Sequence, residues 1–235
     1  MSMKESGLMG FDWGEVLTGE FLLFGLLGKI LYTYPEESWL KSLFDDEMFV
    51  ESPFTGEQAD VIAGLKLLEK TAEEYQRGTD DIITDLKVDY TRLFDHTERI
   101  PVAPWESVYL SKDHLLFQQQ VLEVRSWFNS YGLEIINLHK EPEDHVGLEL
   151  AFLAHLANLG LSAMGEGNES RLEELLDAQR RFLSEHPLKW VPNWCDLMVR
   201  YAHTDFYRGV ALILRGSLME IAEILDLEIP EELAE

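Results

Sequence analysis

The chain has 235 residues, enough to bury a sizeable hydrophobic core as one domain or as two closely packed lobes. Its 19 Lys and Arg residues against 44 Asp and Glu residues give a formal net charge of −25. This charge argues against a nucleic-acid or membrane-surface binder, because phosphates repel such a protein. A basic partner is favoured instead, although the same acidity is equally typical of a helical protein that its surface charge keeps soluble.

The single cysteine, Cys195, excludes an internal disulfide framework and a multi-cysteine zinc or iron–sulfur site. Its apolar neighbours predict a buried structural thiol rather than a nucleophile. The N-terminus has neither a basic segment nor a small-residue cleavage pattern, so we expect no signal peptide. The most apolar run, residues 21–28, is far shorter than the roughly 20 residues that span a bilayer. We therefore expect a buried helix there and no stable membrane insertion.

Apolar residues at helical spacing predict helices along most of the chain, and no alternating strand, repeat or low-complexity segment is evident. The predicted fold class is therefore all-α, a single-domain helical bundle of about nine to eleven helices. Proline, glycine and capping residues set the expected boundaries. In chain order these are Glu15–Tyr34 before Pro35, Ser38–Phe44, Glu57–Gln76 before Gly78, a helix capped by Thr79 that runs through Phe94, Gln118–Tyr131 before Gly132, a helix from Pro142 to Gly160, a helix capped by Asn168 that ends at Ser184, Trp190–Ala202, and Asp205–Leu225.

Two segments between these helices are predicted to have particular roles, one as a functional loop and one as a hinge. Residues 95–110 contain two prolines and several apolar side chains without a regular amphipathic pattern, which predicts a long ordered loop, and such loops are usually functional. Residues 133–141 form the expected hinge between an N-terminal lobe of about residues 1–132 and a C-terminal lobe of about residues 142–235. Opening of this hinge predicts that the protein is either a monomer or a domain-swapped dimer.

The stretch EPEDHVGLEL, which begins at Glu141, has the best-defined helix start. Pro142 suits the first helical position, and Glu143 and Asp144 would then lie in the first turn, where the helix dipole favours carboxylates. His145 and Glu149 are expected on one face, beside a buried stripe. That stripe consists of Val146, Leu150, Leu153 and Ala157.

Two motifs resemble the signature of the TorD/DmsD family of cytoplasmic chaperones for exported molybdoenzymes. One is EPEDHVGLELAFLAHLA from Glu141; the other joins DYTRLF at residues 89–94 to PVAPWESVYL at residues 101–110, similar to the family's Y-x-x-L-F and P-P-x-x-S-x-Y/W-L pattern. The resemblance covers about residues 90–208. It implies a cytoplasmic, non-catalytic protein with no cofactor of its own. The implied partners are the apo catalytic subunit of a molybdopterin-containing oxidoreductase and its twin-arginine leader, whose binding would assist cofactor insertion and prevent premature export.

The resemblance places recognition at the Pro-Trp loop and the Asp-His pair. An apolar groove rimmed by carboxylates suits a peptide that is basic at one end and apolar in its middle. Without the resemblance, core packing of the aromatic residues and a helix-start role for the aspartate explain the same pattern. The expected contact residues are Tyr90, Phe94, Pro104, Trp105, Ser107, Tyr109, Leu110, Phe117, Glu141, Pro142, Asp144 and His145.

Two other functions are open. A metal-dependent helical-bundle enzyme would use Glu141, His145 and Glu149, which recur at four-residue spacing. A proline within this set and the missing paired Glu-x-x-His motifs argue against a metal site, so we expect no bound metal. An acidic adaptor without an export role is the third possibility. The other histidines are scattered and Ser107 has no evident base, so no catalytic residue is predicted.

Overall fold

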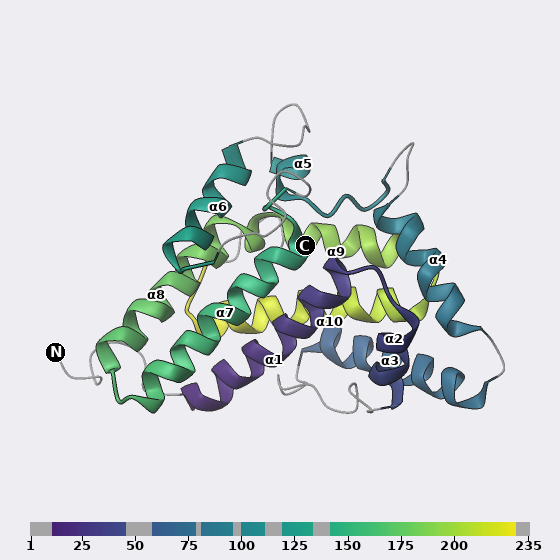
Figure 1. Cartoon of the computed structure of the whole chain (residues 1–235), viewed down its shortest axis with the longest axis horizontal. Helices are drawn as coiled ribbons and strands as arrows, with labels where there is room; N and C mark the ends of the chain where they lie inside the picture. Colours follow the sequence, from purple (N-terminus) through teal and green to yellow (C-terminus); the bar gives the residue numbers. More distant parts are fainter. Residues whose placement is uncertain are drawn as a thin grey trace.

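The computed structural model describes residues 11–45, 58–78, 81–95, 100–110, 119–133 and 142–228. Within these ranges the chain forms ten helices and no strand, which confirms the predicted all-α fold class. Figure 1 shows their arrangement. The helices are α1 (Trp13–Tyr32), α2 (Glu37–Asp45), α3 (Ala59–Arg77), α4 (Ile82–Phe94), α5 (Glu106–Leu110), α6 (Gln119–Ser130), α7 (Val146–Gly165), α8 (Glu169–Glu185), α9 (Pro187–Tyr201) and α10 (Asp205–Ile224).

Several helix ends follow the predicted local signals. Gly78 ends α3 in the left-handed conformation, with φ 62°, which suits a residue without a Cβ. The Asn168 side chain caps α8 by accepting a hydrogen bond from the Arg171 N–H at 3.1 Å. These two boundaries confirm that local chemistry determines where α3 ends and α8 begins.

Other boundaries were predicted wrongly, among them the end of α7, which is Gly165 and not Gly160. The N-cap of α4 is Asp81, whose carboxylate accepts from the Thr84 N–H, and not Thr79, which lies outside the described residues. Helix α9 begins at Pro187, three residues before the predicted start, because proline needs no hydrogen-bond partner for its nitrogen in the first turn. Part of the predicted loop 95–110 is the short helix α5, a single turn that periodicity cannot reveal.

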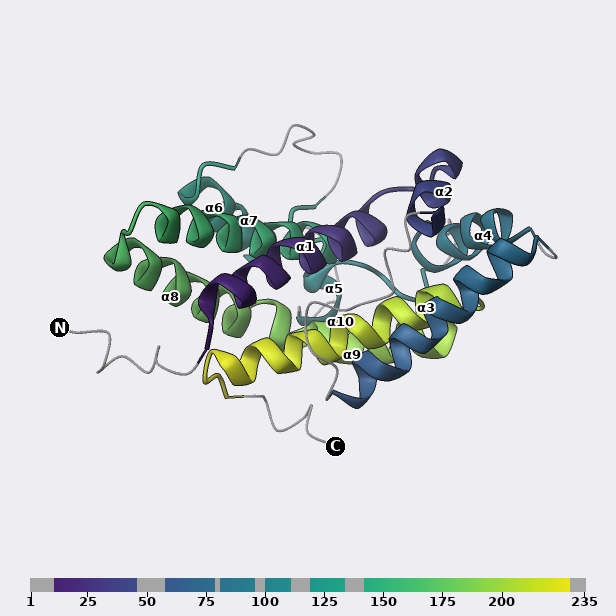
Figure 2. The same ribbon diagram turned by 90° about the horizontal axis from the view of Figure 1, so that it is seen from below.

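Two close helix contacts join early and late parts of the chain. Helix α1 lies along α7 and helix α3 lies along α10, as Figures 1 and 2 both show. Each contact depends on a pair of facing glycines: a Cβ added to Gly28 would lie 2.8 Å from the Gly147 carbonyl oxygen, and one added to Gly64 would lie 2.7 Å from that of Gly209. The helices of the two predicted lobes are therefore packed directly on one another.

Helix α7 is the central helix of the core. Its predicted stripe of four apolar residues is fully buried. The helix is long and apolar enough to cross a membrane by length and composition, but 61% of its most apolar window is buried inside the protein. Cys195 is also buried, as predicted, and burial raises the pKa of its thiol. The apolar run 21–28 lies within α1 but is only partly buried, because Phe21 and Leu22 are exposed.

The predicted hinge at residues 133–141 lies almost wholly outside the described residues, which include only Leu133 of this segment. Gly132, directly before it, has φ 76° and ends the turn after α6, as predicted. The hinge, the two lobes and the domain-swapped dimer stay predictions.

Candidate functional site

The two motifs meet at one place, which we call the junction, where residues 104–107 lie against residues 143–146. Trp105 and His145 form an isolated antiparallel bridge. On either side of it, the Val146 N–H donates to the Pro104 carbonyl oxygen at 2.8 Å, and the Glu106 N–H donates to the Asp144 carbonyl oxygen at 2.9 Å. Each motif thereby supplies an acceptor for an N–H group in the first turn of the other motif's helix, groups that have no partner within their own helix.

The bridge explains why α7 begins at Val146 and not at Pro142, as the sequence had predicted. His145 is extended, with φ −76° and ψ 131°, and its Nδ1 accepts a hydrogen bond from the Gly147 N–H at 3.0 Å. Burial lowers the pKa of His145 to about 3, so the ring is neutral and Nδ1 is free to accept. His145 is thus the N-cap of α7, and the two acidic residues before it, Glu143 and Asp144, lie outside the helix.

Asp144, expected on a groove rim, is instead fully buried. Its Oδ2 accepts a hydrogen bond from the Ser107 N–H at 2.7 Å, so the carboxyl caps the first turn of α5 from another part of the chain. Burial raises the pKa of Asp144, and the hydrogen bonds from Ser107 oppose that rise. Asp144 therefore belongs to the junction and also stabilises the fold by capping α5.

Glu143 is buried as well, but a cation balances its charge. Arg125 of α6 donates to both of its carboxylate oxygens, at 2.8 and 3.0 Å. Such a two-pronged pair is among the stronger charge-assisted contacts in proteins. It ties α6 to the segment that leads into α7.

Three buried carboxyl groups lie close together here, those of Glu106 and Asp144 in the junction and that of Glu149 in the first turn of α7, and we call them the acid cluster. Glu106 contacts the His186 Nδ1 at 2.9 Å, and Oε2 of Glu149 accepts from the Trp190 indole N–H at 3.2 Å. Burial raises the pKa of Glu149 well above its ordinary value, and the charges of its two neighbours raise it further. The pKa of Glu106 is also raised by burial, against the opposing effect of His186.

Aromatic side chains fix the Pro-Trp loop on α9. The Tyr109 hydroxyl and the Trp194 indole N–H both donate to the Ala103 carbonyl oxygen, at 2.9 and 3.0 Å. The Tyr109 ring also stacks on Trp190, with centroids 5.4 Å apart. Trp105 is half-buried and meets the His145 ring edge to face at 6.1 Å. The loop is therefore a rigid element that presents part of one tryptophan to solvent.

The structure brings together only some of the predicted contact residues. Pro104, Trp105, Ser107, Asp144 and His145 meet at the junction, whereas the others are distributed around it. Tyr90 and Phe94 belong to the core beside Tyr207, Tyr109 packs on α9, Leu110 is partly exposed at the end of α5, and Pro142 is buried just before the junction; Phe117 and Glu141 lie outside the described residues.

In the alternative of a metal site, two of the three proposed ligands already make other contacts. Nδ1 of His145 is used by Gly147, and one oxygen of Glu149 is used by Trp190. Among the residues whose positions are described, no group of three His, Cys, Asp or Glu side chains could hold a metal ion. The third residue of the set, Glu141, lies outside them.

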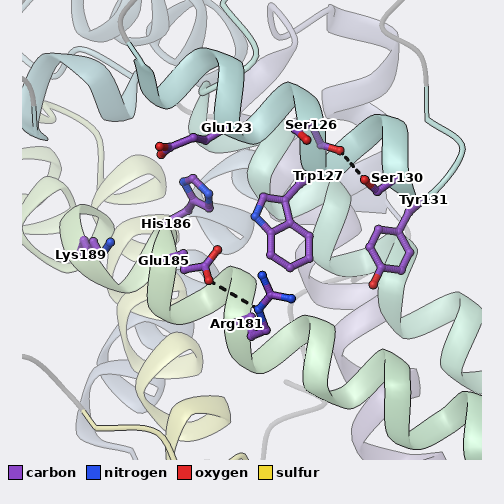
Figure 3. A pocket seen from close by; sticks show the side chains of 9 residues that line it. All are labelled: Glu123, Ser126, Trp127, Ser130, Tyr131, Arg181, Glu185, His186 and Lys189. Carbon is purple, nitrogen blue, oxygen red and sulfur yellow. Dashed lines mark hydrogen bonds and ion pairs between the residues drawn. The ribbon is translucent and has the colours of Figure 1, made fainter.

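An open pocket of about 600 Å³ lies between α6 and the α8–α9 corner (Figure 3). The Arg181 guanidinium lies over the Trp127 ring, 5.0 Å from its centroid. His186 lines the pocket and also contacts Glu106 of the acid cluster. The lining residues are Glu123, Ser126, Trp127, Ser130, Tyr131, Arg181, Glu185, His186 and Lys189.

Sequence reasoning missed four residues of this site: Glu106, Glu143, His186 and Trp190. The first two stand inside the recognised motifs, so their position in PWESV and EPEDH was the only signal available. The other two lie at the α8–α9 corner, outside both motifs. Their link to the site is a contact across the fold, which no local pattern encodes.

A family model described as nitrate reductase delta subunit matches residues 56–196, more than half of the chain and including both motifs. The chain belongs to this family. The chain is similar to a probable Tat proofreading chaperone DmsD of Haemophilus influenzae, 26% identical over 205 residues that cover 87% of this chain and 91% of the relative. The chaperone protein TorD of Vibrio cholerae is 27% identical over 200 residues, or 80% and 89% of the two chains. The Tat proofreading chaperone DmsD of Salmonella typhi is 26% identical over 199 residues, or 83% and 85%. The predicted TorD/DmsD family is confirmed.

Proposed function

We propose that this protein is a cytoplasmic, non-catalytic chaperone that binds the twin-arginine leader and the apo form of a molybdopterin-containing oxidoreductase. In this role it assists cofactor insertion and holds back export until the client has folded. The junction is the observation that carries the proposal, because there the two motifs typical of the family form one structure, with Trp105 half-exposed beside His145. The names of the relatives support the same role.

The charge of the molecule suits such a partner. A leader that carries adjacent arginines and an apolar segment is attracted by a protein of net charge −25, and long-range attraction of this kind raises the association rate. A half-exposed tryptophan on a rigid loop is a typical anchor for the apolar part, because little conformational entropy is lost when a peptide packs on it.

Binding equilibria alone explain when such a chaperone holds its client and when it releases it. A chaperone that binds the unfolded or apo client better than the finished enzyme keeps the leader covered while the cofactor is absent. Once the client folds around its cofactor, the chaperone loses contacts and dissociates. No covalent chemistry is required, and none of the junction residues needs a catalytic role.

Replacing Trp105 by alanine tests the site. We expect Trp105→Ala to bind a synthetic peptide of two arginines and an apolar segment at least about tenfold more weakly, because truncation of an interface anchor commonly costs about 2 kcal/mol. Isothermal titration calorimetry measures the affinity, and thermal melts verify the fold. The matched control is Trp39→Ala, which removes a half-buried tryptophan that packs beside Lys29 on α1. Equal affinity in both folded variants would remove the junction from the binding site.

Affinity capture with the tagged protein identifies the client. The tagged protein is expressed in its own host and the bound proteins are identified by mass spectrometry, with and without the Trp105→Ala change. We expect a molybdoenzyme catalytic subunit that still carries its leader and lacks its cofactor. Enrichment of unrelated proteins without leaders, unaffected by Trp105→Ala, would favour the acidic adaptor instead.

A further inference from the structure

The pocket between α6 and the α8–α9 corner contains a pair of half-buried aromatic rings, which we call the aromatic floor. Trp127 and Tyr131 lie four residues apart on α6, and their rings are nearly parallel, at 13°, with centroids 6.2 Å apart. Both rings also contact the buried ring of Phe152, and Trp127 contacts that of Phe182 as well. Because the core holds both rings in place, an apolar side chain can pack on them at little cost in conformational entropy.

Two basic side chains line the same pocket and have N–H groups available for a ligand. The Arg181 guanidinium lies over Trp127, and its ion pair with Glu185, at 3.6 Å, is longer than a hydrogen bond. Lys189 makes no ion pair within the part of the chain that the structure describes, although acidic residues outnumber basic ones by 44 to 19. In Figure 3 the Glu185 side chain lies between those of Arg181 and Lys189. Each of these two cations can therefore bind a separate carboxylate of a ligand.

The charge of the pocket differs from that of the chain as a whole. Its two basic residues, Arg181 and Lys189, are balanced by two acidic ones, Glu123 and Glu185, when histidine is counted as neutral. The whole chain has a formal net charge of −25. An acidic ligand is therefore repelled less at this pocket than over the surface in general, and it finds two cations there.

We propose that this pocket is a second client site, which binds an acidic segment of the oxidoreductase itself and not its leader. Carboxylates of that segment contact Arg181 and Lys189, and an apolar or aromatic side chain between them packs on the aromatic floor. The inference rests on the proposed function, and it adds the chemistry of the segment that is bound outside the leader. The volume of about 600 Å³ suits a ligand of a few residues.

The pocket and the junction then prefer client segments of opposite charge. The two sites are neighbours, because His186 lines the pocket and also contacts Glu106. A client that occupies both sites binds more tightly than through either one, because the first contact holds the second segment at a high effective concentration. A client whose folding has buried the acidic segment loses this gain. The pocket therefore distinguishes the unfinished client from the finished one.

The test is a calorimetric titration of the whole protein with an acetylated, amidated peptide in which one phenylalanine lies between two glutamates. It is run at low salt, because ions screen exposed charges. The comparison peptides carry glutamine in place of both glutamates or glycine in place of phenylalanine. The variants are Arg181→Gln and Lys189→Gln, singly and together. The matched control is Arg171→Gln, which changes an arginine of α8 that pairs with Glu174 outside the pocket. All three positions are exposed, so the variants should fold.

We expect each single variant in the pocket to bind the glutamate peptide about threefold more weakly, and the double variant about tenfold more weakly. Arg171→Gln should bind it as the unaltered protein does. The glutamine and glycine peptides should both bind more weakly than the glutamate peptide, and inorganic phosphate should not displace it. The two-arginine peptide should bind to the unaltered protein and to the double variant without loss.

Equal binding of the glutamate and glutamine peptides, or an equal loss in Arg171→Gln and Lys189→Gln, would overturn the inference. Displacement by inorganic phosphate would also overturn it, because the pocket would then be a site for a small anion. If the two-arginine peptide binds and the glutamate peptide does not, the pocket is not a client site and the proposed function stands. If the two-arginine peptide does not bind to the unaltered protein, the proposed function fails, and this inference fails with it.

Discussion

Two buried aspartates, one in each family motif, differ in how many hydrogen-bond donors surround their carboxylates. Asp89, which opens the first motif, accepts hydrogen bonds from the His203 N–H, the Thr204 N–H and hydroxyl, and the Arg92 guanidinium, all between 2.7 and 2.9 Å. Asp144, in the second motif, has one backbone donor for one oxygen and none for the other. A carboxylate surrounded by donors stabilises a fold, whereas a buried carboxylate with one oxygen left without a donor contributes less to stability.

The largest loss of stability is expected on replacing Asp89, whose carboxylate has several hydrogen-bond donors. Asp89→Asn leaves the donors from the corner between α9 and α10 facing an amide, and we expect it to lower the free energy of unfolding by about 3 kcal/mol. Urea denaturation measures the change, with the exposed Asp85→Asn on the same helix as control, for which about 0.5 kcal/mol is expected. If the two variants unfold alike, the surrounding donors contribute little and the contrast between the aspartates loses its basis.

Replacing a third buried acid, Glu20, should change the free energy of unfolding by an intermediate amount, and here the change is a gain. Glu20 of α1 is held by the Gln179 side chain of α8 at 2.6 Å, and burial raises the pKa of Glu20 to about 8. Because the folded state holds this proton more tightly than the unfolded state, stability falls as pH rises from about 4.5 to about 8. Glu20→Gln should remove this dependence and raise the free energy of unfolding by at least about 1 kcal/mol at pH 8. Urea titrations at pH 5 and pH 8 check it; equal slopes against pH in both proteins would contradict it.

The smallest effect on stability is expected at the acid cluster. Glu149→Gln keeps an oxygen for the Trp190 indole N–H and removes a proton-binding group, so the free energy of unfolding should change by less than about 1 kcal/mol at pH 7. The measurement is again urea denaturation, without peptide. A loss of stability as large as that of Asp89→Asn would mean that Glu149 is a structural carboxylate. The proposed difference between the two buried acids would then be wrong.

The sequence predicted those features that local patterns encode. The apolar periodicity of α1, α3 and α10 predicted their positions to within a few residues, and the two motifs predicted the family. The start of α7 was missed because its cap is a histidine, an unusual capping residue whose role depends on burial. The acid cluster was missed for a different reason: its carboxyls come from separate segments, and only the fold brings them together.

The glycine contacts between α1 and α7 and between α3 and α10 also constrain how the chain folds. The main packing surface of α3 is α10, so the contact between Gly64 and Gly209 forms only after most of the chain has left the ribosome. Contacts between such distant segments slow folding, because the entropy of a long loop is lost before the packing compensates for it. The folding chain therefore passes through a state in which the face of α3 that later packs on α10 is still uncovered.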